Sequence, residues 1–376
     1  MQLYIMQTYS RELLRVGAIL LLMFTSFQSI ASSKSQYCNL PKDELINGGY
    51  ILLEKSCVFN ESILITKSNT ILDCNNSIID GQGRLNNGVM IISQGKSIRN
   101  ILVKNCTIKN FKHSGIGVSS GISPEKLSPD HKRNYDNSPT DIIIDNVTVE
   151  TNAGVGVYID DYVTKTIIKN SVIKSSGSTG IYLDQSSKFN QVINNVIENN
   201  GFPTEEGRGE REGLAIDSSA NNIIEGNKFI NNAAGGVFLY KNCGEAFKTG
   251  KSVIRWQHSD FNIIKNNFFS GQPIGVWIAS RQSRDLSKWG CGDDSMDKEK
   301  HFYQDFSKYN KVVGNEFCRN KIAIKIEDDN NIIKNNSFDE DVSKQINIPM
   351  TMREKLLGEK TIGNDITENE NKKCDH

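Results

Sequence analysis

The 376-residue sequence lacks a net charge, a nucleotide-binding motif and a long apolar run. Lys plus Arg and Asp plus Glu both number 44, so no overall field indicates binding to nucleic acid or to an anionic membrane. Neither a P-loop nor a strand–GxGxxG–helix unit is present, which leaves a nucleotide cofactor without support. The apolar fraction of 37% is low for a compact core and favours an elongated fold with a thin interior.

The longest apolar run lies near the N-terminus and is too short to cross a bilayer, which needs about 20 apolar residues. Arg11 and Arg15 precede this run over residues 16–27, and a small-residue site ending at Ala31 follows it. This order predicts a signal peptide over residues 1–31. We therefore expect a secreted or periplasmic protein with no membrane attachment after cleavage; a retained signal anchor is the alternative.

The eight cysteines all follow the expected cleavage site, and their even number fits an oxidising compartment with disulfide bonds. The sequence does not determine how they pair. We favour a bond between Cys243 and Cys291, because both belong to insertions on the same side of the repeat described below. The alternative is that some are buried thiols.

Two short phrases recur along the chain and set its period. One begins with glycine and then alternates apolar with polar or aromatic residues; it occupies residues 156–160, 180–184 and 213–217 and, in weaker form, 236–240 and 275–279. The other is rich in Asn and ends on an apolar residue at positions 108, 149, 173, 197, 229, 269, 317 and 338. The shortest spacings between these ends are 24 (149 to 173), 24 (173 to 197) and 21 (317 to 338) residues. Such periods are typical of solenoids, in which each coil buries its face against the next.

The sequence between these phrases consists of short runs of residues that favour β-strands, separated by Asn, Asp and Gly, and its apolar residues do not recur with the period of a helix. The pattern of leucine-rich repeats is absent, and TPR or ankyrin units would need helices. Three short strands per coil, with Asn and Gly at the corners and Ile, Val and Phe inside, predict an all-β parallel β-helix. We expect a single β-helix domain over residues 32–345, followed by a cap and polar tail over residues 346–376. Within the latter we expect a short helix near residues 350–360 and disorder from residue 361.

The two phrases and an Asp-Gly-Gln-Gly opening at residues 80–83 resemble those of right-handed parallel β-helix proteins related to pectate lyases and uronan epimerases. The resemblance covers residues 48–340 and implies a right-handed coil and a polysaccharide substrate. It assigns no catalytic residue. The polygalacturonase motifs are missing except for an echo at Asp160-Asp161, as are the Asp-Pro-His motif of the epimerases and the Ca²⁺-binding set of the pectate lyases.

Four insertions lengthen the repeat, at residues 121–140, 202–212, 243–260 and 282–309. Three of the four leave from the same corner, just after the glycine phrase. Loops from one corner of a solenoid stack into a wall, which is often the binding face.

If the glycine phrases stack in register, their outward side chains form two columns beside that wall. The first column is Tyr158, Tyr182, Ala215, Phe238 and Trp277, and the second is Asp160, Asp184, Asp217, Tyr240 and Ala279. Rungs about 4.8 Å apart would bring the carboxylates nearly into contact. This predicts a Ca²⁺ site at Asp160, Asp184 and Asp217, or an acid/base pair for glycoside hydrolysis. The alternative is a solvated row of surface charges.

All three tryptophans, Trp256, Trp277 and Trp289, fall within one short window. The same window and its leading edge hold Tyr240, Lys241, Arg255, His258, Arg281 and Arg284. Aromatic rings lie against sugar faces and guanidinium groups pair with carboxylates, so this composition predicts an acidic polysaccharide. The residues expected to bind it are Tyr158, Tyr182, Phe238, Arg255, Trp256 and Trp277. The alternative is that Trp256 and Trp289 only anchor two insertions.

A uronate polymer offers a reaction that this set suits. β-Elimination and C5-epimerisation both begin when the sugar carboxylate is neutralised and a base removes the C5 proton. We assign neutralisation to Arg281 or Arg284 and proton transfer to Tyr240, Lys241 or His258. The predicted function is a monomeric polysaccharide lyase or C5-epimerase, with Ca²⁺ as the candidate cofactor. A hydrolase using the aspartates and a non-catalytic glycan-binding protein are the alternatives.

Overall fold

The computed structural model describes residues 36–204 and 209–374. The predicted signal peptide therefore lies outside the described residues. Within the described ranges, no helix is both long enough and apolar enough to span a membrane.

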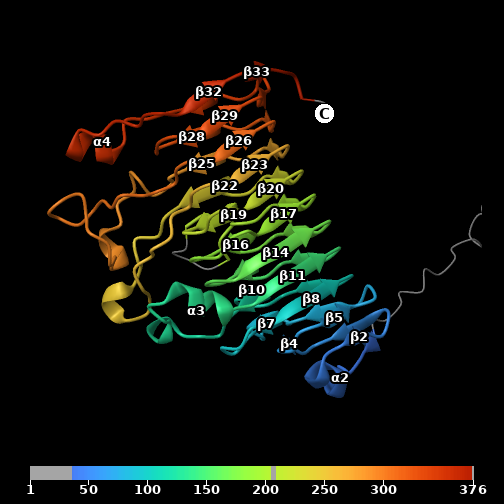
Figure 1. The fold of residues 1–376 in the computed structure, drawn as a ribbon. Coiled ribbons are helices and arrows are strands. Elements are labelled where there is room, and N and C mark those ends of the chain that lie inside the picture. Colours follow the sequence, from blue (N-terminus) through green and yellow to red (C-terminus); the bar gives the residue numbers. More distant parts are fainter. Residues whose placement is uncertain (1–35, 205–208, 375–376) are drawn as a thin grey trace, which may run out of the picture. The chain divides into compact units, whose positions relative to one another are not determined.

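The chain winds through three parallel sheets, called here sheets A, B and C (Figure 1). Sheet A has 12 strands: β1 (Gln36–Tyr37), β3 (Cys57–Phe59), β6 (Ile78–Asp80), β9 (Thr107–Lys109), β12 (Thr148–Glu150), β15 (Val172–Lys174), β18 (Val196–Glu198), β21 (Lys228–Ile230), β24 (Phe268–Ser270), β27 (Glu316–Cys318), β30 (Ser337–Phe338) and β33 (Glu370–Asn371). Sheet B has 11 strands: β2 (Tyr50–Leu52), β5 (Thr70–Asp73), β8 (Arg99–Lys104), β11 (Thr140–Asp145), β14 (Thr164–Lys169), β17 (Gln191–Ile193), β20 (Ile223–Glu225), β23 (Ile263–Lys265), β26 (Lys311–Val313), β29 (Ile332–Lys334) and β32 (Asp365–Thr367). Sheet C has 10 strands: β4 (Ile63–Ile65), β7 (Asn87–Ile92), β10 (Ser114–Ser119), β13 (Val155–Ile159), β16 (Ile181–Leu183), β19 (Glu212–Asp217), β22 (Gly235–Tyr240), β25 (Ile274–Ile278), β28 (Ile322–Ile326) and β31 (Lys344–Asn347).

Each coil takes one strand from sheets B, A and C in turn, as β2, β3 and β4 do in the first coil. The prediction of a right-handed parallel β-helix is confirmed. Over residues 36–204 and 209–374 the helices are few and short: α2 (Lys42–Asn47), α3 (His131–Asp136) and α4 (Met352–Leu357), with 3₁₀ turns at Pro124–Lys126, Phe247–Thr249 and Ser287–Trp289.

The interior is one continuous column of aliphatic and aromatic side chains. In β13, for example, Val157 and Ile159 point inward and are fully buried, while Tyr158 lies on the outer face. Four phenylalanines of sheet A stack through successive coils; the first two, Phe229 and Phe269, have ring centroids 4.9 Å apart. Because each coil buries its apolar face on the next, the thin core suffices without a compact globule.

Asparagines at equivalent corners of successive coils hydrogen-bond to one another, and we call each such row an asparagine ladder. The side-chain oxygen of Asn267 accepts from the backbone N–H of Asn227 at 2.9 Å and from its Nδ2 at 3.0 Å, and the Asn267 amide donates to the carbonyl of Ile224 at 2.9 Å. Other asparagines, such as Asn266 with a φ of 55°, adopt the left-handed conformation at the same corners. The Asn expected at the corners is therefore present, in the left-handed conformation that such a corner needs.

The ladder gives a first testable expectation. Asn267→Ala removes a buried acceptor and leaves the backbone N–H of Asn227 unsatisfied, so the free energy of unfolding should fall by about 1–3 kcal/mol. Chemical denaturation measures this change. Lys228→Ala, at an exposed position of the preceding coil, is the control and should change it by less than about 0.5 kcal/mol. Equal stability of the two variants would contradict the role of the ladder.

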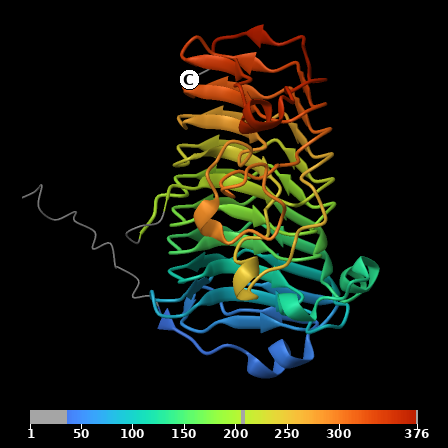
Figure 2. The same cartoon turned by 90° about the vertical axis from the view of Figure 1, so that its left-hand side faces the viewer.

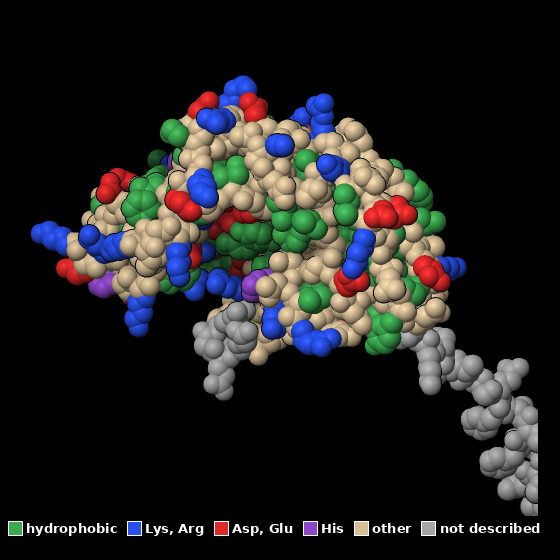
Figure 3. Space-filling view, turned by 90° about the horizontal axis from the view of Figure 1, so that it is seen from below, with side chains coloured by type: hydrophobic (Ala, Val, Ile, Leu, Met, Phe, Trp, Pro, Cys, Tyr) green, Lys and Arg blue, Asp and Glu red, His purple; other side chains and the backbone are tan. Residues whose placement is uncertain are grey.

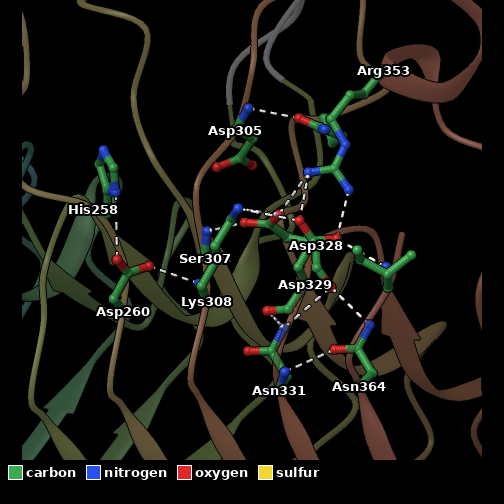
Figure 4. A network of polar contacts seen from close by, with 12 residues as sticks. His258, Asp260, Asp305, Ser307, Lys308, Asp328, Asp329, Asn331, Arg353 and Asn364 are labelled. Carbon is green, nitrogen blue, oxygen red and sulfur yellow. Dashed lines mark hydrogen bonds and ion pairs between the residues drawn. The ribbon is translucent and has the colours of Figure 1, made fainter. Parts of the chain in front are cut away.

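The C-terminal region differs from the expected polar tail. Helix α4 falls inside the range predicted for it, but β32 and β33 then pair in parallel with β29 and β30 and add a further coil. Arg353 of α4 is buried and donates to Asp328 at 3.0 Å and to Asp329 at 2.7 Å (Figure 4). These contacts of Arg353 help to order the segment from residue 361, whose composition alone indicates disorder.

Four disulfides join all eight cysteines: Cys38–Cys57, Cys74–Cys106, Cys243–Cys291 and Cys318–Cys374. The pairing predicted between Cys243 and Cys291 is confirmed. It ties the insertion that follows β22 to the insertion that follows β25.

Candidate functional site

The insertions frame the outer face of sheet C. Residues 121–140, 243–260 and 282–309 leave after β10, β22 and β25, and residues 209–212 lead into β19 from the opposite corner. In Figure 2 the two later insertions, yellow and orange, lie in front of the stacked strands. The face beneath them is hollowed, with hydrophobic and acidic side chains inside and Lys and Arg on the rim (Figure 3).

Both outward columns have the predicted register. Tyr158 pairs with Tyr182, Tyr182 with Ala215, Ala215 with Phe238, and Phe238 with Trp277. In the second column Asp217 pairs with Tyr240. The alternation along each strand therefore directs the aromatic and carboxylate side chains away from the core of the solenoid.

A pocket of about 370 Å³ lies where the columns become aromatic. Phe238, Tyr240 and Trp277 form its apolar wall, and the Phe238 and Trp277 rings meet edge to face with centroids 5.2 Å apart. Its charged lining residues are Glu210, Arg211, Glu212, Arg281, Arg284 and Lys325. The rim therefore carries four cations around a small aromatic surface.

Two guanidinium groups at the pocket are held by aromatic rings. Arg281, only 4% exposed, lies 3.9 Å from the centre of the Tyr240 ring and forms an ion pair with Glu245. Arg284 lies 4.7 Å from the ring of Trp289. Burial, together with the charges of Arg281 and Arg211, lowers the pKa of Arg284. Because these positive charges repel one another, an anionic group bound between them would be favoured.

Glu212 is a pocket residue that the sequence did not single out. Its side chain is 4% exposed, and burial raises the pKa of its carboxyl despite the nearby Arg211. Its hydroxyl partner, Thr179 Oγ1, lies 3.4 Å away. The available signal was its position, immediately before the glycine phrase and at the end of an insertion.

The hydroxyl of Tyr240 begins a chain of hydrogen bonds that leads away from the pocket. It donates to the Tyr182 hydroxyl at 3.1 Å, which donates to Asp217 Oδ2 at 2.6 Å. Asn242 Nδ2 also donates to Asp217 Oδ2, at 3.0 Å. Asp217 is fully buried, so its carboxylate lies behind the aromatic wall and not in the hollow.

The three predicted metal-binding aspartates do not form one group. The carboxylates of Asp160, Asp161 and Asp184 lie within 4.8 Å of one another and offer the oxygen ligands that Ca²⁺ prefers, whereas Asp217 is one coil further on. Asp160 accepts from Ser119, and Asp184 accepts from Tyr158.

Arg255 lies close enough to Asp184, Asp217 and Asp161 for those carboxylates to raise its pKa against the effect of burial. Burial, with Asp160 and Asp184, raises the pKa of Asp161. Arg255 and protonation therefore already neutralise part of the negative charge of this cluster.

Asp184 gives a pH-dependent expectation. Burial raises its pKa to about 6, with Arg255 opposing and Asp217 and Asp160 adding to the shift. The folded state then binds more protons than the unfolded state between pH of about 4 and 6, so the free energy of unfolding falls as pH rises through that window. Asp184→Asn should reduce this dependence, as measured by denaturation at a series of pH values. The same slope in both proteins would contradict it.

The structure places three other predicted residues away from the pocket. The ammonium of Lys241 forms an ion pair with Asp293 of an insertion. His258 stacks on Phe306 and lies beside Asp260, at the far end of the polar network of Figure 4. Trp256 stacks on His131, with ring centroids 4.4 Å apart, and so joins two insertions. Of the predicted proton-transfer residues, Tyr240 alone shares the pocket with Arg281 and Arg284.

Comparison with known proteins now identifies the class. The chain matches the family described as right handed beta helix region over residues 61–255, more than half of its length, and it belongs to that family. No curated protein sequence matches it.

Solved structures are similar to this chain at low sequence identity. An alginate lyase from Paenibacillus sp. str. FPU-7 is 12% identical, with a TM-score of 0.54 over 81% of this chain and 94% of that one. The A-module of a mannuronan C-5 epimerase from Azotobacter vinelandii is 12% identical, with a TM-score of 0.45 over 89% and 93% of the two chains. A tailspike protein of E. coli bacteriophage HK620 is 12% identical, with a TM-score of 0.49 over 87% and 60%. At 12% identity the similarity to the alginate lyase extends to the fold alone.

Proposed function

We propose that the protein is an exported, monomeric enzyme that abstracts the C5 proton of a uronate residue in an acidic polysaccharide, as a lyase or a C5-epimerase does. The observation that carries the proposal is the gathering of Arg211, Arg281, Arg284 and Lys325 around the aromatic pocket. Four disulfides favour export.

Binding follows from this arrangement. The uronate carboxylate pairs with the guanidinium groups of Arg281 and Arg284, and a sugar face lies against Trp277. Lys325 Nζ lies 3.8 Å from the Trp277 ring and forms an ion pair with Glu327, to which Trp277 Nε1 donates at 3.1 Å, so this pair holds the indole in place. We assign Tyr182 and Tyr158, which continue the outward column of Phe238, to the binding of further sugars.

The chemical step needs a base and, for elimination, an acid. Charge on the sugar carboxylate grows as the C5 proton leaves, and Arg281 stabilises it because its guanidinium is already fixed by Tyr240 and Glu245. Tyr240 is the group we assign as base. Glu212 is the acid for the leaving oxygen, since a raised pKa favours its protonated form.

Arg284 provides a test of binding. Arg284→Ala removes one charged partner of the carboxylate and should raise KM by about 10- to 150-fold, because such hydrogen bonds contribute roughly 1.5–3 kcal/mol. Lys288→Ala, at an exposed position of the same insertion, is the matched control and should leave KM unchanged. Steady-state kinetics on the active glycan separates them. An unchanged KM for Arg284→Ala would remove this residue from the site.

We also propose Ca²⁺ as the ion for Asp160, Asp161 and Asp184. Carboxylate oxygens suit it, although Arg255 opposes a cation there. The ion would neutralise the acidic end of the groove; the C5 chemistry at the pocket uses the residues named above. Calorimetric titration with Ca²⁺ should give heat in the native protein and none in Asp160→Asn.

A hydrolase is the second candidate. The raised pKa values of Asp161 and Asp184 favour a protonated carboxyl within a cluster of carboxylates, and glycoside hydrolysis uses one carboxylic acid together with one carboxylate. This chemistry would lie at the acidic end of the groove and would yield reducing ends without unsaturation.

The test is incubation with a panel of uronans in D₂O. Ultraviolet absorbance follows the unsaturated uronate of a lyase, and NMR follows deuterium entering at C5 through an epimerase. We expect one of these signals on at least one acidic glycan. Reducing ends without either signal would transfer the assignment to the hydrolase, and no change in any glycan would refute an enzymatic function.

A further inference from the structure

We propose that Tyr182 and Asp217 form a proton relay that allows Tyr240 to act as the base. This inference rests on the proposed function and adds two residues that do not touch the reacting atom. It starts from a buried carboxylate, Asp217, that the chemistry described so far leaves unused.

The geometry is continuous from the pocket to the interior. Tyr240 lines the pocket, its hydroxyl donates to Tyr182 at 3.1 Å, and Tyr182 donates to Asp217 at 2.6 Å. The three residues come from β22, β16 and β19, whose strands lie side by side in sheet C, so the sheet itself sets these spacings. Asn242 and Ser218 donate to Asp217 at 3.0 and 2.9 Å and hold its carboxylate in place.

The relay explains how Tyr240 can act as a base without becoming a charged tyrosinate. Burial raises the pKa of this hydroxyl, so a free tyrosinate in the pocket is costly. With the relay, Tyr240 passes on its own proton as it accepts another and never carries a full charge. Arg281, stacked on the ring, favours whatever partial charge develops.

The step balances. The C5–H bond breaks and its proton forms a new bond to the Tyr240 oxygen, while the Tyr240 proton moves to Tyr182 and the Tyr182 proton moves to Asp217 Oδ2. The electron pair left on C5 delocalises into the sugar carboxylate beside Arg281. In elimination it then forms the C4–C5 double bond as the C4–O bond breaks, and the leaving oxygen takes the proton of Glu212.

A neighbouring pair shows what distinguishes the relay. Tyr158 donates to Asp184 just as Tyr182 donates to Asp217, one coil earlier. The Tyr158 pair has the same tyrosine–aspartate form, but it is Tyr182 that accepts the hydrogen bond of Tyr240. The Tyr158 pair is thus an internal control within the same fold.

The test compares Asp217→Asn and Tyr182→Phe with the native protein on the active glycan. Asp217→Asn keeps the volume and an acceptor for Tyr182 but cannot take a proton. We expect kcat to fall by about 10²-fold with KM unchanged. We also expect the solvent deuterium isotope effect on kcat to disappear, and the rate to rise with pH as hydroxide replaces the relay. In Tyr158→Phe the isotope effect should persist, whatever happens to KM.

The outcomes separate the relay from the proposed function. A native protein that turns over its glycan, with kcat and the isotope effect unchanged in Asp217→Asn, would overturn the relay alone. Loss of stability in that variant without these kinetic changes would likewise reduce Asp217 to a structural role. No C5 exchange or elimination by the native protein would overturn the proposed function and the relay with it.

Discussion

Tyr240→Phe should lower kcat by about 10²–10⁴-fold, the usual contribution of a general acid or base. The change removes the oxygen that accepts the C5 proton and keeps the ring beneath Arg281. Binding should persist, because the cations and Trp277 remain at the pocket. Initial rates over a range of glycan concentrations give kcat and KM separately.

Phe302→Tyr serves as a matched control, since it alters a single hydroxyl in an insertion outside the pocket lining. It should retain native rates. Full activity in Tyr240→Phe would show that another group removes the proton, and a rise in KM alone would reassign Tyr240 to binding.

Arg353→Met should give the largest loss of stability. The side chain is 2% exposed and, together with Lys308, neutralises Asp328 and Asp329, which it reaches from α4. Removing one partner of a buried ion pair leaves uncompensated charge and costs about 3–5 kcal/mol. Since each coil of a solenoid contacts only its neighbours, the loss should concentrate in the last coil.

Hydrogen exchange tests this directly. Amides of β32 and β33 should exchange faster in Arg353→Met, while those of β13 and β16 keep their native rates. Lys355→Ala, on the exposed side of the same helix, should behave as the native protein. Uniform loss of protection along the whole chain would contradict a local role for Arg353.

Much of the fold could be predicted because the same types of side chain recur at the same positions of each coil. The glycine phrase at Gly156 and Gly180 recurs at one coil length, and alternation after each glycine gives the outward positions of Tyr158 and Tyr182. The last coil was missed because β32 and β33 are polar. Its signals were Asn364 and Asn369, which continue the two ladders by accepting from the backbone of Asn331 and Asn336.

The site was only partly predictable, because the side chains of residues adjacent in sequence point to different parts of the structure. Tyr240 ends a strand and lines the pocket, whereas Lys241 follows it into the turn and meets Asp293. His258 belongs to the same composition window but lies near the end of its insertion, against Phe306 of the next insertion. Glu212 reaches the pocket from the opposite corner, and only the folded coil brings that corner to Arg281.

The central claim is that the pocket recognises and acts on a uronate carboxylate. Its most direct test compares turnover of the active glycan with turnover of the same glycan after its carboxyl groups are reduced to alcohols. The cluster of Arg281, Arg284, Arg211 and Lys325 predicts turnover of the native polymer and none of the reduced one. Equal turnover of both polymers would contradict it.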